Sequence, residues 1–368
     1  MAWSNDLNIY SDCIEKGTGN TPRSIMTKGN SISYGTRYGN FIRGNNDKLM
    51  ISYRRESSHD YTMNDACGVL FEGEMHFFGG DMFFRRQHFV IETQRSGQLV
   101  KMTKKLDLEM EYGFTRPSCS SFELISKYFP WFNTNVVILC FDFYHENSCH
   151  LFDGKLTYIG DSNFYHYHGK HSGGLTKYKN MLMTIGPRSS ANNQRFGSAK
   201  QTTELMKVDG DQNFSWSVVE QNYTNFIEFA PGNFIEGHSL VTVEASDINE
   251  EYVLLIGGRN EYYWYYTPPN VFKFNGTWFA FGKLNKPRYD HSSIYWNGAV
   301  YVIGGTYNDD SDVPVMVNQP NLDNTKMEVW NVKDSPDQFN SNEINWPELA
   351  LWRYPHLFII PDSYFPDY

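Results

Sequence analysis

Histidines in the middle of the chain are the first residues whose type and spacing suggest chemistry. His166 and His168 are two positions apart, so on a β-strand both side chains would project from one face, as the ligands of a metal ion do. The alternative is an outer strand on which Tyr and His simply alternate, in the run YHYH. The alternative is favoured, because His171 has counterparts in His238 and His291 that indicate a repeated structural role. Two further histidines of this region are His145 and His150.

Two acidic segments place oxygen-bearing side chains at alternate positions, as calcium-binding loops do. One is the run NDDSD at residues 308–312, and the other is the series Asp209, Asp211 and Asn213. Calcium takes about six to eight oxygen ligands, and an EF-hand loop needs Gly at its sixth position and Glu at its twelfth. Neither segment has those residues, so solvated turns are the favoured interpretation. We expect no bound metal and no cofactor.

Motifs for covalent catalysis are missing from the sequence. It contains no G-x-S-x-G elbow and no Gly-rich phosphate loop that opens a helix. Carboxylates such as Asp142, Glu146 and Asp161 would have to meet in space to act as an acid and a base, and their spacing does not predict that. We therefore assign no catalytic residue and expect that the protein is not an enzyme.

The segment RNEYYWYYTPP at residues 259–269 is the strongest candidate for a binding site. Tyr and Trp offer a large contact area at a small entropic cost and dominate the energetics of many interfaces, and the same rings stack on sugars. The alternative is that alternate rings pack inward while the loop extends a strand across a neighbouring sheet. The candidate binding residues are Tyr262, Tyr263, Trp264, Tyr265 and Tyr266.

A strand-rich pattern that closes on a pair of glycines recurs along the chain. RYDHSSIYWNGAVYVIGG closes on Gly304-Gly305, GHSLVTVEASDINEEYVLLIGG on Gly257-Gly258, and DACGVLFEGEMHFFGG on Gly79-Gly80. A weaker copy ends at the single Gly186. In each copy, two apolar runs flank a short polar turn. Repeats of this kind at a spacing of roughly 40–55 residues are typical of a β-propeller.

The copy that begins at His291 can be divided into strands. HSSIYW and AVYVI are the first two, joined by a turn at Asn297-Gly298, because Asn-Gly accepts the positive φ that a two-residue hairpin turn requires. The Gly pair predicts a strand end where no Cβ is tolerated. KMEVWNV, from Lys326, is the third strand, and the fourth carries a Trp. The outer-strand tryptophans of three copies are predicted to cover the gap between neighbouring blades: Trp216, Trp278 and Trp346.

At these residues the sequence resembles the Kelch-repeat family of β-propellers. The resemblance rests on the apolar run, the Gly pair, the aromatic third strand and the fourth-strand Trp, and it is clear over about residues 233–346. The signatures of WD repeats and of the Asp-box propellers are missing. The resemblance implies a non-catalytic binding protein that presents one loop-rich face to its partner.

We expect an all-β fold, a six-bladed β-propeller of four-stranded antiparallel blades. The last copy has only ELALW and HLFII before the chain ends. The N-terminal runs SISYGTRYGNFI, from Ser31, and KLMISYRRES, from Lys48, are expected to complete this blade and so remove exposed sheet edges. Residues 1–30 are expected to be a polar tail or linker, and residues 31–368 the propeller. Second strands are predicted to end near Gly80, Cys140, Gly186, Gly258, Gly305 and Ile360.

Loop lengths distinguish the two faces of such a propeller. Turns between first and second strands, and between third and fourth, share one face and are often tight here. Loops between second and third strands are long, at residues 187–201, 259–269 and 306–325. Loops beyond about twelve residues in a compact domain are usually functional or disordered. The tight turns are Glu72-Gly73, Asp153-Gly154, Asn275-Gly276 and Asn297-Gly298.

Composition restricts the partners. The formal net charge is −10, which argues against nucleic acid. No run of about 18 apolar residues predicts a membrane span, and the first residues lack the features of a signal peptide. A protein or a glycan is the expected partner, and the chain could be one module of a larger assembly.

Cysteines and sequons bear on the cellular compartment. Cys140 ends a predicted second strand and Cys149 begins a third, so the two could face each other and form a disulfide; Cys67 and Cys119 are predicted to be small buried residues of inner strands. Three N-glycosylation sequons begin at Asn213, Asn222 and Asn275, although the hairpin turn already explains Asn275. These features leave an extracellular and a cytoplasmic location equally supported.

The sequence therefore predicts a binding or scaffold propeller that presents its long-loop face to a protein or a glycan. The alternative is a propeller enzyme that acts on carbohydrate, with carboxylates or histidines gathered at the mouth of the channel. Two carboxylates about 5–10 Å apart in a cleft would favour the alternative.

Overall fold

The computed structural model describes residues 26–27, 31–32, 34–36, 39–43, 47–52, 66–80, 87–93, 100–107, 113–115, 117–123, 135–141, 147–162, 174–188, 200–208, 214–219, 235–245, 250–260, 270–306, 326–345 and 356–361. All regular structure in these residues is β-strand. The chain divides into two compact units. Unit 1 comprises Met1–Gly113 and Pro355–Tyr368, and unit 2 comprises Phe114–Tyr354.

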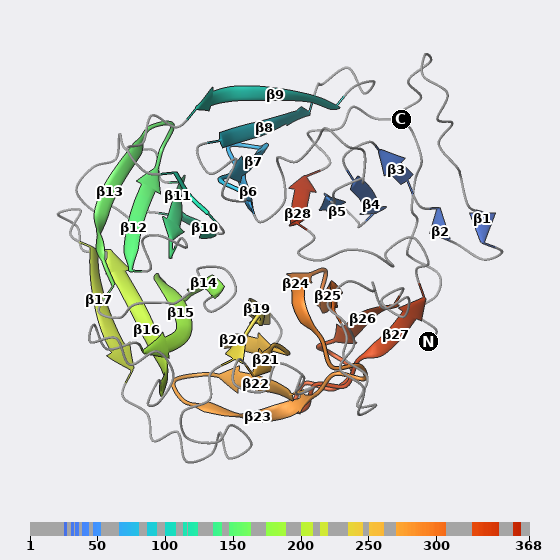
Figure 1. Ribbon diagram of the computed structural model, residues 1–368. Helices are drawn as coiled ribbons and strands as arrows, with labels where there is room; N and C mark the ends of the chain where they lie inside the picture. Colours follow the sequence, from blue (N-terminus) through green and yellow to red (C-terminus); the bar gives the residue numbers. More distant parts are fainter. Residues whose placement is uncertain are drawn as a thin grey trace. The chain divides into compact units, whose positions relative to one another are not determined.

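Unit 2 contains four antiparallel four-stranded sheets, and in each the strand order follows the chain. The first strands of successive sheets lie side by side, β10 beside β14, β14 beside β19 and β19 beside β24, as Figure 1 shows. This is the arrangement of a β-propeller, so an all-β propeller of four-stranded antiparallel sheets is confirmed. The strands are β10 (Ser118–Glu123), β11 (Asn135–Cys140), β12 (Ser148–Phe152) and β13 (Leu156–Asp161); β14 (Gly174–Tyr178), β15 (Met181–Arg188), β16 (Lys200–Val208) and β17 (Phe214–Val219); β19 (Ser239–Ala245), β20 (Glu250–Ile256), β22 (Asn270–Phe274) and β23 (Trp278–Lys283); and β24 (Tyr289–Trp296), β25 (Ala299–Thr306), β26 (Lys326–Asn331) and β27 (Asn342–Asn345).

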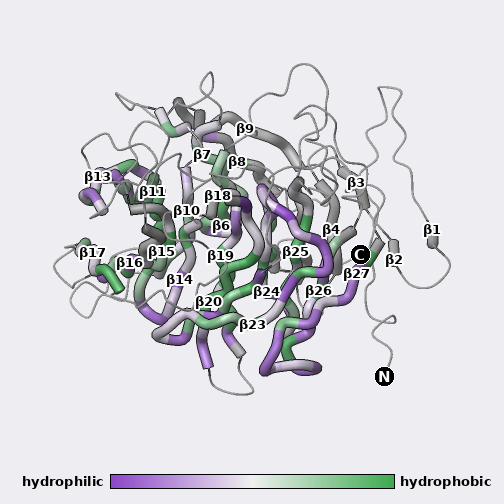
Figure 2. Tube along the Cα trace, turned by 60° about the horizontal axis from the view of Figure 1, so that its bottom comes forward, coloured by the Kyte–Doolittle hydropathy of each residue, from purple (hydrophilic) through white to green (hydrophobic). Residues whose placement is uncertain are grey.

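Burial falls from the middle strands to the outer strand of a blade. Every residue of β22 is buried, because both faces of this strand pack against neighbouring sheets. β23 is partly exposed instead, and both Phe279 and Ala280 face solvent. Figure 2 shows the same gradient, with hydrophobic stretches on β19, β20 and β25 and hydrophilic residues at the connecting turns. No helix in the described part of the chain is long and apolar enough to cross a membrane.

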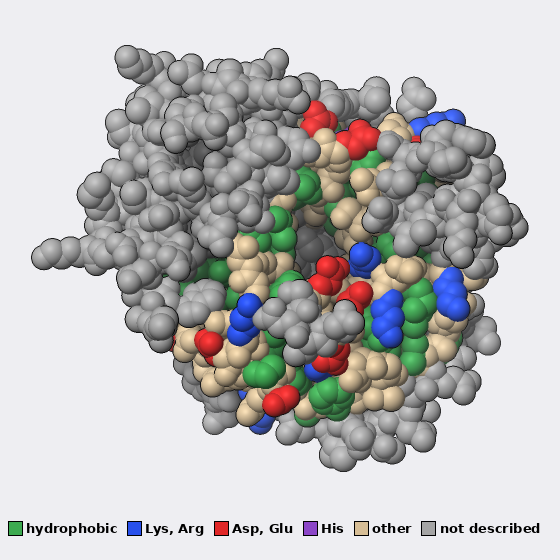
Figure 3. Space-filling model, turned by 180° about the vertical axis from the view of Figure 1, so that it is seen from behind, with side chains coloured by type: hydrophobic (Ala, Val, Ile, Leu, Met, Phe, Trp, Pro, Cys, Tyr) green, Lys and Arg blue, Asp and Glu red, His purple; other side chains and the backbone are tan. Residues whose placement is uncertain are grey.

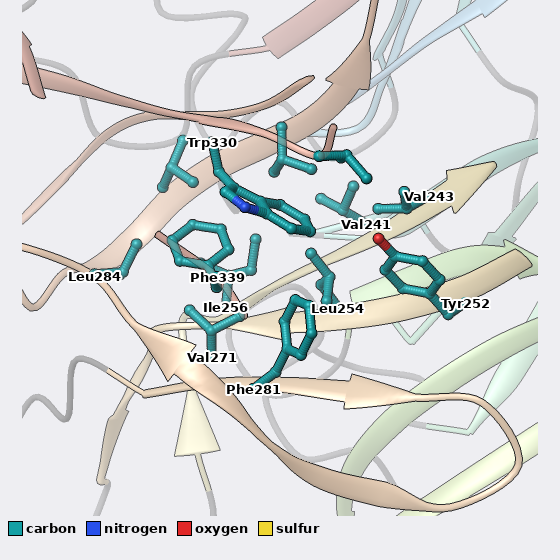
Figure 4. Close-up of a cluster of buried hydrophobic side chains, with 13 residues drawn as sticks. Val241, Val243, Tyr252, Leu254, Ile256, Val271, Phe281, Leu284, Trp330 and Phe339 are labelled. Atoms are coloured by element: carbon teal, nitrogen blue, oxygen red, sulfur yellow. The ribbon is translucent and has the colours of Figure 1, made fainter. Parts of the chain in front are cut away.

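The hydrophobic core lies between neighbouring sheets, and the alternation of side chains along β20 builds it on both sides. Tyr252, Leu254 and Ile256 face Trp330 and the fourth sheet, as Figure 4 shows. Val253 and Leu255 point to the opposite side and join a second cluster with residues of β15. Period-two alternation therefore serves two interfaces at once in an inner strand. Phe281 and Trp330 meet edge to face, with ring centroids 5.4 Å apart.

Outer-strand tryptophans cover the gaps between blades, as the sequence predicts. Trp278 on β23 packs in one cluster with Tyr178 and Met183 of the preceding sheet, and its Nε1 donates to Thr203 Oγ1 of that sheet at 2.8 Å. Trp216 on β17 likewise packs against the sheet before it and lies 5.8 Å from the Phe141 ring. Trp346 lies outside the described residues.

The glycine pairs occupy positions where a side chain does not fit. Gly257 has φ of 57°, and a Cβ placed there would lie 2.5 Å from the carbonyl oxygen of Arg288. Gly305 has φ of 90°, and its Cβ would lie 2.7 Å from the carbonyl oxygen of Tyr289. At Gly257 the close neighbour belongs to the connection into the next first strand, and at Gly305 it belongs to β24, the first strand of the same blade. The predicted exclusion of a Cβ is thus confirmed at these two glycines.

Two predictions about loops are wrong in detail. Gly186 does not end a strand but lies inside β15, because Pro187 and Arg188 still pair with Gln201 and Lys200 of β16. The loop expected at 187–201 is therefore shorter at both ends. Asn297-Gly298 does form the predicted hairpin turn, with φ values of 49° and 78°.

Unit 1 contains two four-stranded antiparallel sheets and one short pair. The first sheet has the order β6-β7-β8-β9, and the second has the order β28-β5-β4-β3. The strands are β1 (Met26–Thr27) and β2 (Ser31–Ile32), which pair with each other, then β3 (Tyr34–Thr36), β4 (Gly39–Arg43), β5 (Asp47–Ser52), β6 (Cys67–Phe71), β7 (Glu74–Phe78), β8 (Gln87–Thr93), β9 (Val100–Asp107) and β28 (His356–Pro361).

The second sheet of unit 1 joins strands from both ends of the chain. β28 pairs with β5, so N-terminal strands do share a sheet with the C-terminal HLFII run. One detail of the prediction is wrong, because the run from Ser31 supplies two strands of this sheet, β3 and β4, so that three N-terminal strands follow HLFII among the described residues. β28 also lies beside β6, the first strand of the other sheet of unit 1. The ELALW run lies outside the described residues.

Four cysteines are oxidised. Cys140 and Cys149 form a disulfide between β11 and β12, which confirms that these two residues face each other. Cys67 and Cys119 are also disulfide-bonded. The expectation that these two are plain buried thiols is therefore wrong, because each sulfur is bonded to another sulfur.

Candidate functional site

The aromatic segment predicted to bind a partner extends from the third sheet of unit 2. Tyr262, Tyr263, Trp264, Tyr265 and Tyr266 themselves lie outside the described residues. The structure does describe both ends of the loop that carries them. β20 ends before Gly257-Gly258, and β22 starts at Asn270. The described part of the candidate site is therefore the base of this loop.

Backbone hydrogen bonds close the base of this loop. The N–H of Gly257 donates to the carbonyl oxygen of Asn270 at 3.1 Å, which joins the two ends of the loop to each other. The N–H of Gly258 donates to the carbonyl oxygen of Arg288 at 2.9 Å, in the connection to the next sheet. The residues between 258 and 270 are thus held at both ends by the sheet framework.

A two-stranded sheet extends this base beyond the blade. β21 (Arg259–Asn260) pairs with β18 (Ile235–Glu236), with Arg259 opposite Glu236 and Asn260 opposite Ile235. β18 belongs to the connection between the second and third sheets, so two separate loops of the same sheet end are joined by a β-ladder. This pairing fixes the direction in which the chain leaves toward the aromatic residues.

Side chains below the loop add a second layer of contacts. The guanidinium of Arg259 lies over the Tyr289 ring, 4.6 Å from the centroid, a cation–π contact. Asp290 adopts φ of 59°, and its N–H donates to the carbonyl oxygen of Gly237 at 2.7 Å. Gly237 is itself in the left-handed region, and a Cβ there would lie 2.5 Å from Asp290 Oδ1. The three loop connections at this sheet end are therefore packed against one another.

A buried ion pair supports the connection from beneath. Arg288 Nη2 lies 2.9 Å from Glu328 Oε1, and both side chains are almost fully removed from solvent. Arg288 Nη1 also donates to the carbonyl oxygen of Gly304 at 3.1 Å. Burial lowers the pKa of the Arg288 guanidinium, and the facing carboxylate of Glu328 opposes that shift. This pair links the connection just before β24 to β26, which is a structural arrangement.

Glu328 receives more donors than its ion-pair partner. Its Oε1 accepts from the N–H of Lys286, and its Oε2 accepts from the N–H of Asn285 at 2.8 Å and from Ser341 Oγ at 2.7 Å. The carboxylate therefore binds backbone groups of the connection that precedes its own blade. Because all of these donors belong to the framework, the Glu328 carboxylate has a structural role.

The repeated histidines have a structural role, as the sequence predicts, and the structure adds that they join successive blades. His291 Nε2 lies 2.9 Å from Ser239 Oγ on the preceding first strand, and His238 Nε2 accepts from the N–H of Gly174 at 3.4 Å. Ser239 directly follows His238, and Gly174 lies shortly after His171, the histidine of its own copy. Burial lowers the pKa of His291 to about 3, and nearby Arg288 contributes to the shift, so this ring is neutral. His171 lies outside the described residues.

The other sequence candidates that the structure describes, His150 and Asp161, form no joint site. His150 contacts the rings of Phe114 and Tyr158 edge to face, and Asp161 accepts from the Tyr158 hydroxyl at 2.8 Å. This hydrogen bond raises the pKa of Tyr158. The described residues hold no group of three or more His, Cys, Asp and Glu side chains arranged for a metal. The candidates outside the described residues are His145, His166, His168, Asp142, Glu146, Asp209, Asp211, Asn213 and residues 308–312.

Charged side chains of both signs share the surface. Figure 3 shows acidic and basic groups close together on the described part of one face. Lys177 Nζ lies 3.8 Å from Glu244 Oε1, and both of these side chains are exposed. Lys273 is instead buried, pairs with Glu250 at 3.2 Å and lies over the Tyr252 ring at 3.9 Å. These pairs connect neighbouring strands or sheets.

Sequence reasoning did not find the base of the aromatic loop. Arg259, Tyr289 and Asp290 are ordinary turn residues by type, and only the block RYDH directly before a predicted first strand could have drawn attention to them. A buried histidine pair was also missed: His76 Nδ1 and His88 Nε2 lie 2.9 Å apart across β7 and β8. Their spacing along the chain carries no signal, because the sheet register brings them together.

Comparison of the sequence with models of known protein families and with curated proteins finds no match.

Proposed function

We propose that this chain is a non-catalytic binding propeller of the Kelch type, which presents the face that carries the aromatic loop to a protein or glycan partner. In this proposal the ring has six blades and is closed by the sheet that strands from both chain ends share. The chain acts as a scaffold and performs no reaction of its own.

The observation that carries the proposal is the base of the aromatic loop. Gly257 and Asn270 are joined by a backbone hydrogen bond, and Arg259 is held both by the ladder to β18 and by the Tyr289 ring. A rigid scaffold that holds a loop of contact-forming residues is the usual design of a binding surface. Five consecutive aromatic residues on such a base offer large area at small entropic cost.

The Kelch type and the six-blade count have support of their own. A glycine pair with positive φ follows β20 directly and another lies just before the end of β25, a buried Trp330 lies on a third strand, and Trp278 on a fourth strand covers the gap between sheets. Unit 2 supplies four blades, and unit 1 has two further four-stranded sheets, one of which contains both β5 and β28. Joining of the chain ends in one sheet is how a propeller protects its edges.

The contacts of the buried ionisable groups also support the proposal of a scaffold protein. Arg288, Glu328 and His291 are the side chains whose chemistry would be most useful in a catalytic site. Each of them bonds to another strand or to a blade connection. The described acids and bases therefore stabilise the framework below the loop.

The test compares the full chain with a variant that carries Tyr263→Ala, Trp264→Ala and Tyr266→Ala. Binding is measured on a glycan array and by pulldown, and thermal unfolding is followed in parallel. The matched control is Tyr158→Ala, which removes an exposed ring from the outer strand β13. We expect the triple variant to lose binding with unchanged stability, and the control to keep binding. Loss of stability in the triple variant would mean that the rings belong to the core, and equal binding by all three proteins would refute the proposal.

A further inference from the structure

One sequon of this chain forms an exposed tight turn. Asn275, Gly276 and Thr277 connect β22 to β23, and all three are exposed. The residues on either side, Phe274 and Trp278, are buried at 1% and 5% exposure. A Cβ built on Gly276 would meet no atom within 4 Å, so the space around the turn is open.

Turn chemistry accounts for only part of this sequence. Gly276 takes φ of 113°, which glycine accepts, whereas both residues of Asn297-Gly298, between β24 and β25, have positive φ. The residue after that second turn is Ala299, which is fully buried. Thr277 is exposed instead, so the hairpin places no demand on its hydroxyl. The hydroxyl at this position is the element that an N-glycosylation acceptor requires in addition to Asn.

The disulfides indicate the compartment in which this turn would be modified. Cys140 and Cys149 are bonded to each other, and Cys67 and Cys119 are oxidised as well. Disulfides form and persist in oxidising compartments such as the lumen of the endoplasmic reticulum and are rare in the cytosol. N-glycosylation occurs in that same lumen, so the two observations are independent and point to one location.

We propose that Asn275 carries an N-linked glycan. In the transfer, the side-chain amide nitrogen of Asn275 forms a bond to the anomeric carbon of a lipid-pyrophosphate-linked oligosaccharide. The bond from that carbon to the pyrophosphate oxygen breaks, the lipid pyrophosphate leaves with the electron pair, and the amide gives up one proton. The glycan would leave the chain at an exposed residue, next to a glycine whose Cβ would meet no atom within 4 Å.

The modified turn lies at the other end of β22 from the aromatic loop. β22 has five residues, so the two ends are separated by roughly 17 Å at about 3.3 Å per residue. A glycan at Asn275 would therefore cover one end of the third sheet and leave the loop end clear. The proposal does not depend on what the loop binds.

The test expresses the full chain behind a cleavable leader in eukaryotic cells, with Asn213→Gln and Asn222→Gln so that Asn275 is the remaining sequon. The mass of the secreted protein is measured before and after treatment with peptide N-glycosidase. We expect a glycosidase-sensitive increment that Thr277→Ser retains and that Thr277→Val and Asn275→Asp both abolish. Asp is also favoured in turns, so a missing glycan increment in Asn275→Asp would not result from a folding defect.

The overturning result is a secreted protein with an oxidised Cys140–Cys149 pair and the mass of the bare polypeptide. An increment that survives in both Thr277→Val and Asn275→Asp would also overturn the proposal, because the sugar would then be attached elsewhere. If Asn275→Asp is not secreted, the mass increments of Thr277→Val and Thr277→Ser are compared instead, because Ser keeps the side-chain hydroxyl and Val lacks it.

Discussion

Replacement of Glu328 by Gln tests whether the buried ion pair stabilises the fold. The Glu328 carboxylate accepts two donors on each oxygen: Arg288 Nη2 and the N–H of Lys286 on Oε1, and the N–H of Asn285 and Ser341 Oγ on Oε2. A Gln amide offers one oxygen and one NH₂ group. With the NH₂ group at the Oε1 position, both the Arg288 guanidinium and the Lys286 N–H face a donor; at the Oε2 position the Asn285 N–H does, whereas the Ser341 hydroxyl can turn to accept.

The expected cost follows from these contacts. Each buried donor left without an acceptor costs about 1–3 kcal/mol, and removal of one partner of a buried ion pair costs about 3–5 kcal/mol. We therefore expect Glu328→Gln to lower the free energy of unfolding by about 4 kcal/mol. Arg288→Met leaves Glu328 with three donors, so we expect a smaller loss of about 3 kcal/mol.

A double-mutant cycle separates the pair from its surroundings. Urea unfolding is followed by tryptophan fluorescence, to which the buried Trp330 contributes, and the free energies of the two single variants and of Arg288→Met/Glu328→Gln are compared. The double variant buries neither charge, so we expect it to be more stable than the sum of the singles by about 2 kcal/mol. Strictly additive losses, or single losses below about 1 kcal/mol, would show that the pair is not a structural unit.

Two further predictions address other parts of the same framework. Gly257→Ala should destabilise the chain by about 3 kcal/mol, because a Cβ would lie 2.5 Å from a carbonyl oxygen at a residue with positive φ. Gly298→Ala has the same backbone strain in open space and should cost about 1 kcal/mol; equal losses in urea unfolding would contradict the steric argument. His291, whose pKa is lowered to about 3 from an ordinary 6.5, binds no proton in the folded chain, whereas it does in the unfolded chain below about pH 6.5. The free energy of unfolding should therefore decrease as the pH is lowered from about 6.5 to about 3, by up to about 1.4 kcal/mol per pH unit. His291→Gln should reduce this slope. An unchanged slope, in unfolding measured from pH 7 to pH 4, would refute the role of His291.

The sequence predicts the blades well where local rules decide the structure. Asn297-Gly298 fixes a hairpin, and the Gly pair at 304–305 marks the end of the following strand, because both demand backbone geometry that few other residues adopt. The strands of the last two sheets of unit 2 follow from these signals. Gly186 lacks a second glycine, and there the sequence misplaces the strand end.

Contacts that depend on which strands are neighbours in a sheet could not be predicted from the spacing of residues along the chain. Arg288 sits in the turn-like block PRYDH and Glu328 in the apolar strand KMEVWNV, forty positions later. Their contact depends on β24, β25 and β26 being neighbours in one sheet. The last blade is predicted in part: β28 does pair with an N-terminal strand, β5, but the spacing of residues did not show that the run from Ser31 contains two paired strands, β3 and β4.

The connection at residues 284–291 links stability to the proposed binding face. The Arg288 side chain reaches Glu328 in the interior, while its carbonyl oxygen accepts the Gly258 N–H at the base of the aromatic loop. Tyr289 supports Arg259 in the same way. Under the proposed function, substitutions within 261–269 should change binding alone. Substitutions at Arg288 alter the base itself, and a loss of binding there must be read together with the loss of stability that accompanies it.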